Sequence, residues 1–79
     1  MNMTKREEIL EILHKIRPSV DFEHVEGILD NNYLDSLEFL NLITELGKHF
    51  GIEIGVEEIT SQNFNTVDTI EEMIERIGG

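Results

Sequence analysis

The residues with the clearest chemical potential are Asp35, Ser36 and Glu38, which stand directly before an apolar run. Asp35 followed three residues later by Glu38 is typical of a capping box, so Asp35 is the expected N-cap of a helix. Ser36 would then be the first helical residue, with a hydroxyl that is not needed as the cap. A helix N-terminus offers unpaired N–H groups and the positive end of the helix dipole, which favour a phosphate. The sequence therefore places a free hydroxyl where a phosphodiester would be tolerated.

The same hydroxyl could act as a nucleophile if a histidine served as its base. The chain has no Gly-x-Ser-x-Gly motif, and 79 residues leave little room for an oxyanion hole and a substrate pocket. A hydrolase is therefore the weaker hypothesis, and we expect no catalytic residue. The three histidines fit solvated flanking positions better: His14, His24 and His49.

A calcium-binding loop starting at Asp30 fails on its spacing. Asp30 and Asn32 suit the first two ligand positions, but Leu34 replaces the third oxygen ligand. Asp35 stands where the loop needs glycine, and Asn41 stands where it needs glutamate. We predict no defined metal site. Diffuse binding of divalent cations stays open at three later carboxylates, Glu53, Glu57 and Glu58.

Composition narrows the possible classes of function. Seventy-nine residues make one small domain, residues 1–79, with a marginal core. Six basic and 17 acidic residues give a net charge of −11, which argues against nucleic acid or anionic membranes as partners and favours basic protein surfaces. The lack of cysteine excludes disulfides and Cys-based zinc sites. No apolar run approaches the roughly 20 residues of a membrane span, and no signal-peptide core is present, so we expect a cytoplasmic protein. We also expect it to be a monomer.

A helix is predicted on the N-terminal side of the site. It begins at a second capping box, Thr4 with Glu7, and ends at Arg17-Pro18, because the residue before proline is pushed out of the helical region. A long connection, residues 18–34, follows and is too apolar for a solvated linker, so we expect it to pack and to contain a helical turn near Phe22–Val25. The predicted apolar face of the helix consists of Ile9, Ile12, Leu13 and Ile16.

The helix that presents Ser36 is expected to run to about Phe50 and to end at Gly51. An extended link and one short helical turn near Val56–Ile59 should follow it. The predicted inward stripe consists of Leu37, Leu40, Ile43, Leu46 and Phe50, widened by Phe39 and Leu42.

A third helix is predicted from an N-cap at Thr66, with Phe64 as an apolar anchor before it. Its end, Gly78-Gly79, also occurs in ubiquitin-like proteins, but those are β-rich and this chain is helical in period. The expected fold class is all-α: a small antiparallel bundle of three main helices plus one short helix, with a long first loop. The apolar face of the third helix consists of Ile70, Met73, Ile74 and Ile77.

Asp35-Ser36-Leu37 followed by this helix, within a short acidic chain of helical pattern, resembles the acyl carrier protein family over roughly residues 5–77. The resemblance implies that Ser36 carries 4′-phosphopantetheine, attached by a phosphopantetheinyl transferase. It further implies a carrier rather than an enzyme. The cargo, acyl or aminoacyl, would be held as a thioester and passed from a loading ligase to synthase or transferase enzymes in fatty-acid, polyketide or related biosynthesis.

The resemblance also implies a surface for partner recognition around the attachment site, formed by Asp35, Leu37, Glu38 and Glu45. In fatty-acid carriers the outer face of this helix is acidic, whereas Asn41, Lys48 and His49 occupy such positions here. In having Tyr33-Leu34 directly before the motif, the chain resembles D-alanine carriers and other specialised carriers. The alternatives are thus a D-alanine or other aminoacyl carrier and, less favoured, a helical interaction module without an arm.

Overall fold

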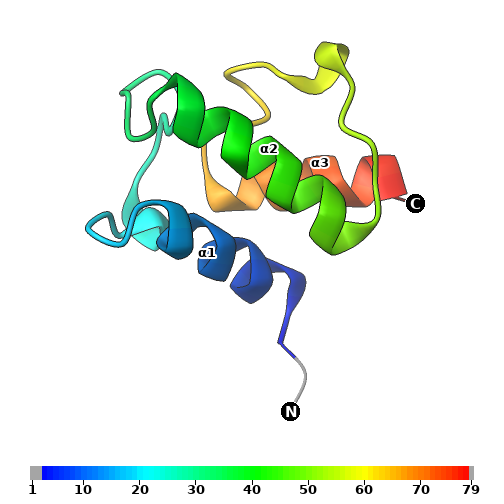
Figure 1. Ribbon diagram of the computed structural model, residues 1–79, viewed down its shortest axis with the longest axis horizontal. Helices are drawn as coiled ribbons and strands as arrows, with labels where there is room; N and C mark the ends of the chain where they lie inside the picture. Colours follow the sequence, from blue (N-terminus) through cyan, green and yellow to red (C-terminus); the bar gives the residue numbers. More distant parts are fainter. Residues whose placement is uncertain (1–2, 79) are drawn as a thin grey trace.

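The computed structural model describes residues 3–78, and these contain three α-helices and no strand (Figure 1). The helices are α1 (Lys5–Ile16), α2 (Ser36–Phe50) and α3 (Val67–Gly78), and two short 3₁₀ turns, η1 (Phe22–His24) and η2 (Val56–Glu58), lie in the loops between them. Helix α1 packs against both other helices and runs opposite to them in Figure 1. The all-α bundle with a long first loop is therefore confirmed.

Helix α1 has the predicted ends. The hydroxyl of Thr4 accepts a hydrogen bond from the N–H of Glu7 at 3.1 Å, and the N–H of Thr4 donates to the Glu7 carboxylate at 2.8 Å. The second bond lowers the pKa of Glu7. Arg17 closes the helix as its C-cap. The expected apolar face is confirmed, since Ile9, Ile12 and Leu13 are buried and Ile16 is partly buried.

Helix α2 also has its predicted bounds, but its predicted inward stripe was partly wrong. Leu42 and Leu46 are its buried residues, whereas Leu37 is 78% exposed and Leu40 is 59% exposed. The helix carries apolar residues on most of its sides, so periodicity alone could not select the face that turns inward. At its end Gly51 adopts the left-handed conformation (φ 63°), which glycine takes without steric cost.

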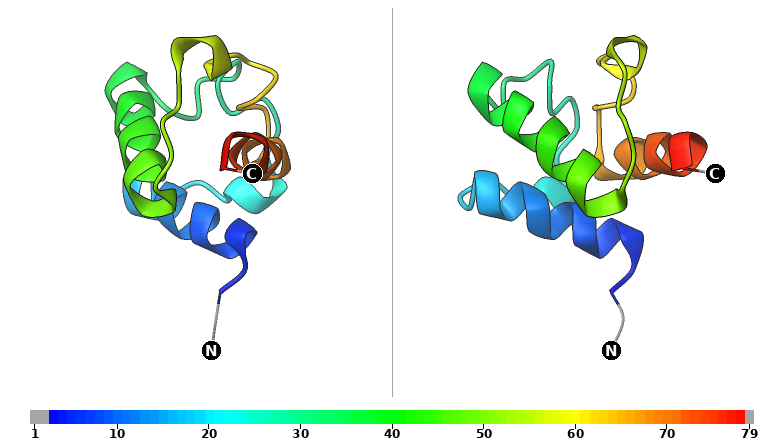
Figure 2. Two further views of the ribbon diagram at one scale, coloured as in Figure 1. Left: turned by 90° about the vertical axis from the view of Figure 1, so that its right-hand side faces the viewer. Right: turned by 45° about the vertical axis from the view of Figure 1, so that its right-hand side comes forward.

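The first loop is packed, as its apolar residues predict. Phe22, at the start of η1, is buried together with Ile28 and Leu34. Gly27 has a φ of 65°, and its N–H donates to the side chain of Asn65 at 2.7 Å. The N–H of Ile28 bonds the backbone carbonyl of the same asparagine at 3.1 Å. These bonds tie the first loop to the loop after α2. The part of the first loop between η1 and α2 lies, like the loop after α2, above α1 in the views of Figure 2.

The last part of the chain follows the prediction closely. Phe64 is buried, and its ring meets that of Phe39 edge to face at 4.9 Å. Thr66 caps α3, because its hydroxyl accepts the N–H of Thr69 at 3.2 Å. Three residues of the expected face, Ile70, Met73 and Ile74, are buried. The glycine pair does not belong to a β-rich, ubiquitin-like fold, as the helical pattern indicated. Gly78 ends α3, and Gly79 lies outside the described residues.

Candidate functional site

The capping box at the start of α2 forms as predicted and leaves Ser36 free. The Asp35 carboxylate accepts the N–H of Glu38 at 2.8 Å, and the N–H of Asp35 donates to the Glu38 carboxylate at 2.9 Å. Ser36 is the first residue of α2 and is exposed. Its hydroxyl is therefore available at a helix N-terminus.

Arg17 is a component of this site that the sequence analysis missed. Its Nη1 donates to the Glu38 oxygen that also caps α2, at 2.8 Å, and lies 3.5 Å from the backbone carbonyl of Tyr33. The C-cap of α1 is thereby joined to the N-terminus of α2. A basic residue before a proline is a common helix ending, so the local pattern gave no signal of this contact.

A groove opens beside Ser36, between the end of α1, the first loop and the start of α2. Its volume is about 790 Å³. It is lined by Arg17, Leu29, Asn32, Leu34, Asp35, Ser36, Phe39 and Leu40. The lining thus combines four apolar side chains with one guanidinium next to an exposed hydroxyl.

These residues fit a phosphodiester on the hydroxyl of Ser36. The N–H groups of Glu38 and Phe39 are occupied by Asp35, so those of Ser36 and Leu37 are the ones left at the helix start. The positive end of the α2 dipole and the guanidinium in the groove both favour negative charge there. An exposed serine with room around it also allows an enzyme to reach the oxygen.

The expected recognition residues surround Ser36 to different degrees. Leu37 projects into solvent next to it and is the most accessible apolar side chain near the site. Asp35 and Glu38 are adjacent as well, but both are used in the cap, and the side chain of Glu38 is only 23% exposed. Glu45 is exposed and lies more than two turns further along α2, in a groove shared with α1.

The histidines do not support a catalytic role for Ser36. His24 lies 2.7 Å from the Asp21 carboxylate and His49 lies 3.1 Å from that of Glu8, so each has a carboxylate partner elsewhere. No hydrogen bond joins Ser36 to a histidine among residues 3–78. The hydrogen bond between His24 and Asp21 raises the pKa of the imidazole and lowers that of the carboxyl group.

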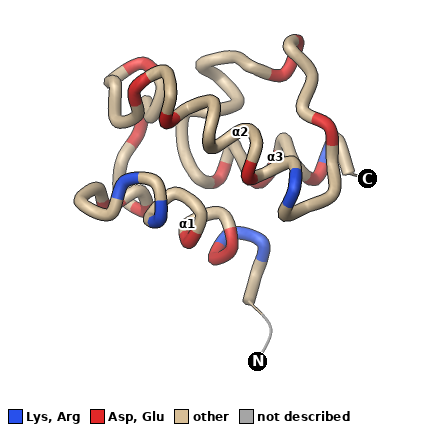
Figure 3. The backbone as a smooth tube through the Cα atoms, in the orientation of Figure 1, with Lys and Arg blue, Asp and Glu red and all other residues tan. Residues whose placement is uncertain are grey.

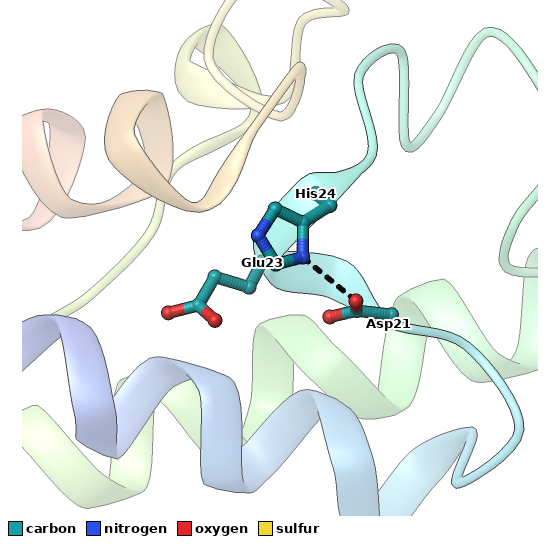
Figure 4. A group of neighbouring side chains, drawn as sticks. All are labelled: Asp21, Glu23 and His24. Carbon is teal, nitrogen blue, oxygen red and sulfur yellow. Dashed lines mark hydrogen bonds and ion pairs between the residues drawn. The ribbon is translucent and has the colours of Figure 1, made fainter.

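Figure 4 shows a group of possible metal ligands at η1 that the sequence analysis did not single out. One ligand atom from each of Asp21, Glu23 and His24 lies within 4.8 Å of the others, and all three residues are exposed. Glu23 is already paired with Arg6 at 3.1 Å, as His24 is with Asp21. Arg6 also bonds Asp68 at 2.9 Å, and these two bonds raise its pKa, that to Asp68 more than that to Glu23.

One of the carboxylates considered for diffuse cation binding is also paired. Glu58 accepts a hydrogen bond from Arg76 at 2.6 Å and another from the Asn63 amide at 3.2 Å. Its charge is thus partly neutralised within the fold.

Comparison with known proteins identifies one family. A family model described as the phosphopantetheine attachment site matches residues 7–77, most of the chain and all of the groove beside Ser36. A search of curated proteins found no significant match. Within residues 3–78, every helix is too short or too polar to cross a membrane.

Proposed function

Because the chain belongs to the phosphopantetheine attachment-site family, we propose that it is a carrier protein with 4′-phosphopantetheine on Ser36. The observation that carries this proposal is the exposed hydroxyl at the first position of α2, left free by the Asp35–Glu38 cap. The prosthetic group would supply a terminal thiol that holds cargo as a thioester. The chain itself has no cysteine, so this thiol would be its sole one.

The function of the protein would be to hold cargo and deliver it to partner enzymes rather than to transform it. A tethered substrate reaches the active site of each partner at a high effective concentration. The chain's own contribution is a rigid start of α2, which Arg17 and the capping box hold in place. The partners would be a phosphopantetheinyl transferase, a loading ligase and downstream synthase or transferase enzymes, all cytoplasmic.

The cargo is proposed to be an acyl group in fatty-acid, polyketide or related biosynthesis, with D-alanine or another amino acid as the second candidate. Tyr33-Leu34 before the attachment site and Lys48 on α2 favour a specialised member of the family over a general fatty-acid carrier. The positive charge of Lys48 would repel enzymes whose basic docking surface is complementary to an acidic helix.

The attachment site is tested by intact-mass spectrometry after incubation with coenzyme A and a phosphopantetheinyl transferase. We expect one adduct of the mass of phosphopantetheine per chain, and none in Ser36→Ala. Ser19→Ala and Ser61→Ala are matched controls and should be modified normally. An adduct that persists in Ser36→Ala would disprove the assignment.

The class of function is tested with the unmodified protein, in which the hydroxyl of Ser36 is free. That protein alone should hydrolyse no chromogenic ester. Esterase activity that disappears in Ser36→Ala would show that the hydroxyl is a nucleophile and that the carrier proposal is wrong.

A further inference from the structure

The groove beside Ser36 has a composition that the attachment of an arm does not by itself require. Its walls combine hydrocarbon from Leu29, Phe39 and Leu40 with a cation from Arg17. An enzyme that modifies or binds a serine needs an exposed oxygen, but it does not need a groove of this composition beside that oxygen. The groove therefore has the features of a binding site in its own right.

Arg17 has donors to spare for an anion in this groove. Both of its contacts use Nη1, while Nη2 and Nε make no hydrogen bond to any described residue. The side chain is 43% exposed, so its free edge is accessible. A guanidinium presents five N–H donors in a planar fork that matches phosphate oxygens. The carboxylate of Asp35 also lines the groove and would repel a phosphate. A cation is therefore needed nearby to offset that repulsion.

Leu40 supplies an apolar surface in line with the attachment point. It lies four residues after Ser36, so the two side chains share one face of α2. A leucine side chain in a helix leans toward the N-terminus, which here means toward Ser36. Leu40 is nevertheless 59% exposed, although it borders the groove. An apolar group that covered it would bury hydrocarbon surface.

The arm of 4′-phosphopantetheine has the matching order of groups. The phosphodiester is bonded to the serine oxygen, a carbon bearing two methyl groups follows, and two amides lead to the thiol. We propose that this groove binds the prosthetic arm itself, with its phosphodiester at Arg17 and its dimethyl segment at Leu29 and Leu40. The arm would rest there between encounters and would leave the groove to enter a partner. This inference rests on the proposed function, because it requires the arm on Ser36.

The test uses the full chain modified with isotope-labelled coenzyme A, and its readout is NMR rather than activity. Isotope-filtered spectra should show nuclear Overhauser contacts from the arm methyl groups to Leu29 and Leu40. Leu40→Ala should weaken the contacts to Leu29, whereas Leu37→Ala, a matched change of an exposed leucine outside the groove, should not. Both leucines are exposed, so neither change should prevent folding.

The cation is tested in parallel. Arg17→Ala should reduce the docked population by about two- to fivefold, the range for one solvent-exposed ion pair. Arg17→Lys should restore part of it, and Lys15→Ala, which removes an exposed cation of α1 outside the groove, should change nothing. An arm that gives no contact to the protein, or contacts outside this groove, would overturn the inference even if mass spectrometry shows one adduct on Ser36. If no adduct forms, the proposed function fails first and the inference falls with it.

Discussion

At the scale of single residues, Glu38 has two roles that are joined through one oxygen. That oxygen accepts the N–H of Asp35 in the cap and the guanidinium of Arg17 from the end of α1. We predict that Arg17→Ala and Glu38→Ala each destabilise the fold, and that their effects are not additive. Because the pair is partly exposed, a double-mutant cycle from urea unfolding should give a coupling of about 0.5–1 kcal/mol.

The matched control is the pair Lys15 and Glu11 on α1, whose charged atoms are 3.9 Å apart and largely exposed. Its coupling should be no more than about 0.3–0.5 kcal/mol, as for other helical pairs four residues apart. If the Arg17–Glu38 cycle gave no more coupling than this control, the bridge between α1 and α2 would contribute little to stability.

Because His24 is paired with Asp21, we expect the stability of the fold to depend on pH. The hydrogen bond to Asp21 raises the pKa of His24 in the folded protein above its value in the unfolded chain, which is near 6.5. The stabilisation of the fold by protonated His24 is therefore complete below that unfolded pKa and is lost as the pH rises through the folded pKa. The same bond lowers the pKa of Asp21, so its stabilisation is lost as the pH falls through that folded pKa. The pair should therefore contribute most between about pH 4 and pH 6.5.

An NMR titration of the His24 ring measures this directly. Asp21→Asn should lower the pKa of His24 toward its ordinary value, and Glu45→Gln, which removes an exposed carboxylate on α2, serves as the control. An unchanged His24 titration in Asp21→Asn would contradict the assigned hydrogen bond.

At the scale of elements, the ends of the helices were easier to predict than their faces. The start of α2 depends on Asp35 and Glu38, three residues apart, and its end depends on Gly51, so both signals are local. Which side of α2 is buried depends on where α1 and α3 lie, and local periodicity does not contain that information. Leu40 was therefore assigned to the wrong face although the helix bounds were right.

The two faces of α2 should differ sharply in their response to substitution. Leu42→Ala removes a fully buried side chain and should cost about 2–5 kcal/mol of unfolding free energy. Leu40→Ala changes an exposed side chain on the same helix and should stay within about 0.5 kcal/mol of the parent. Urea unfolding of both variants measures the difference, and similar losses would mean that the assigned inward face is wrong.

The site divides in the same way between local and distant contributions. The position of Ser36 as the first, exposed residue of α2 could be predicted because it follows from the adjacent cap. Arg17 could not, because its contact with Glu38 spans 21 residues and depends on how the first loop folds. The groove needs that loop as well, since Leu29, Asn32 and Leu34 come from it.

At the scale of the whole molecule, the charge is unevenly distributed. Four of the six basic residues lie in α1 or at its C-cap, whereas carboxylates occur along the whole chain, α1 included (Figure 3). Lys48 is the one lysine or arginine within α2. Any partner that reaches Ser36 from the α2 side therefore meets two carboxylates of this helix, Glu38 and Glu45, together with this lysine.

This arrangement leads to a prediction about partner choice. Lys48→Glu should raise kcat/KM for loading by a general fatty-acid carrier enzyme by roughly two- to fivefold at low salt, because rim charges mainly steer encounter. The gain should shrink at moderate ionic strength, where exposed charges are screened. Lys5→Glu, at the N-terminus of α1, makes the same change in net charge at a different place and is the control. Equal gains in the two variants would show that net charge alone matters, and no gain in either would remove the argument for a specialised carrier.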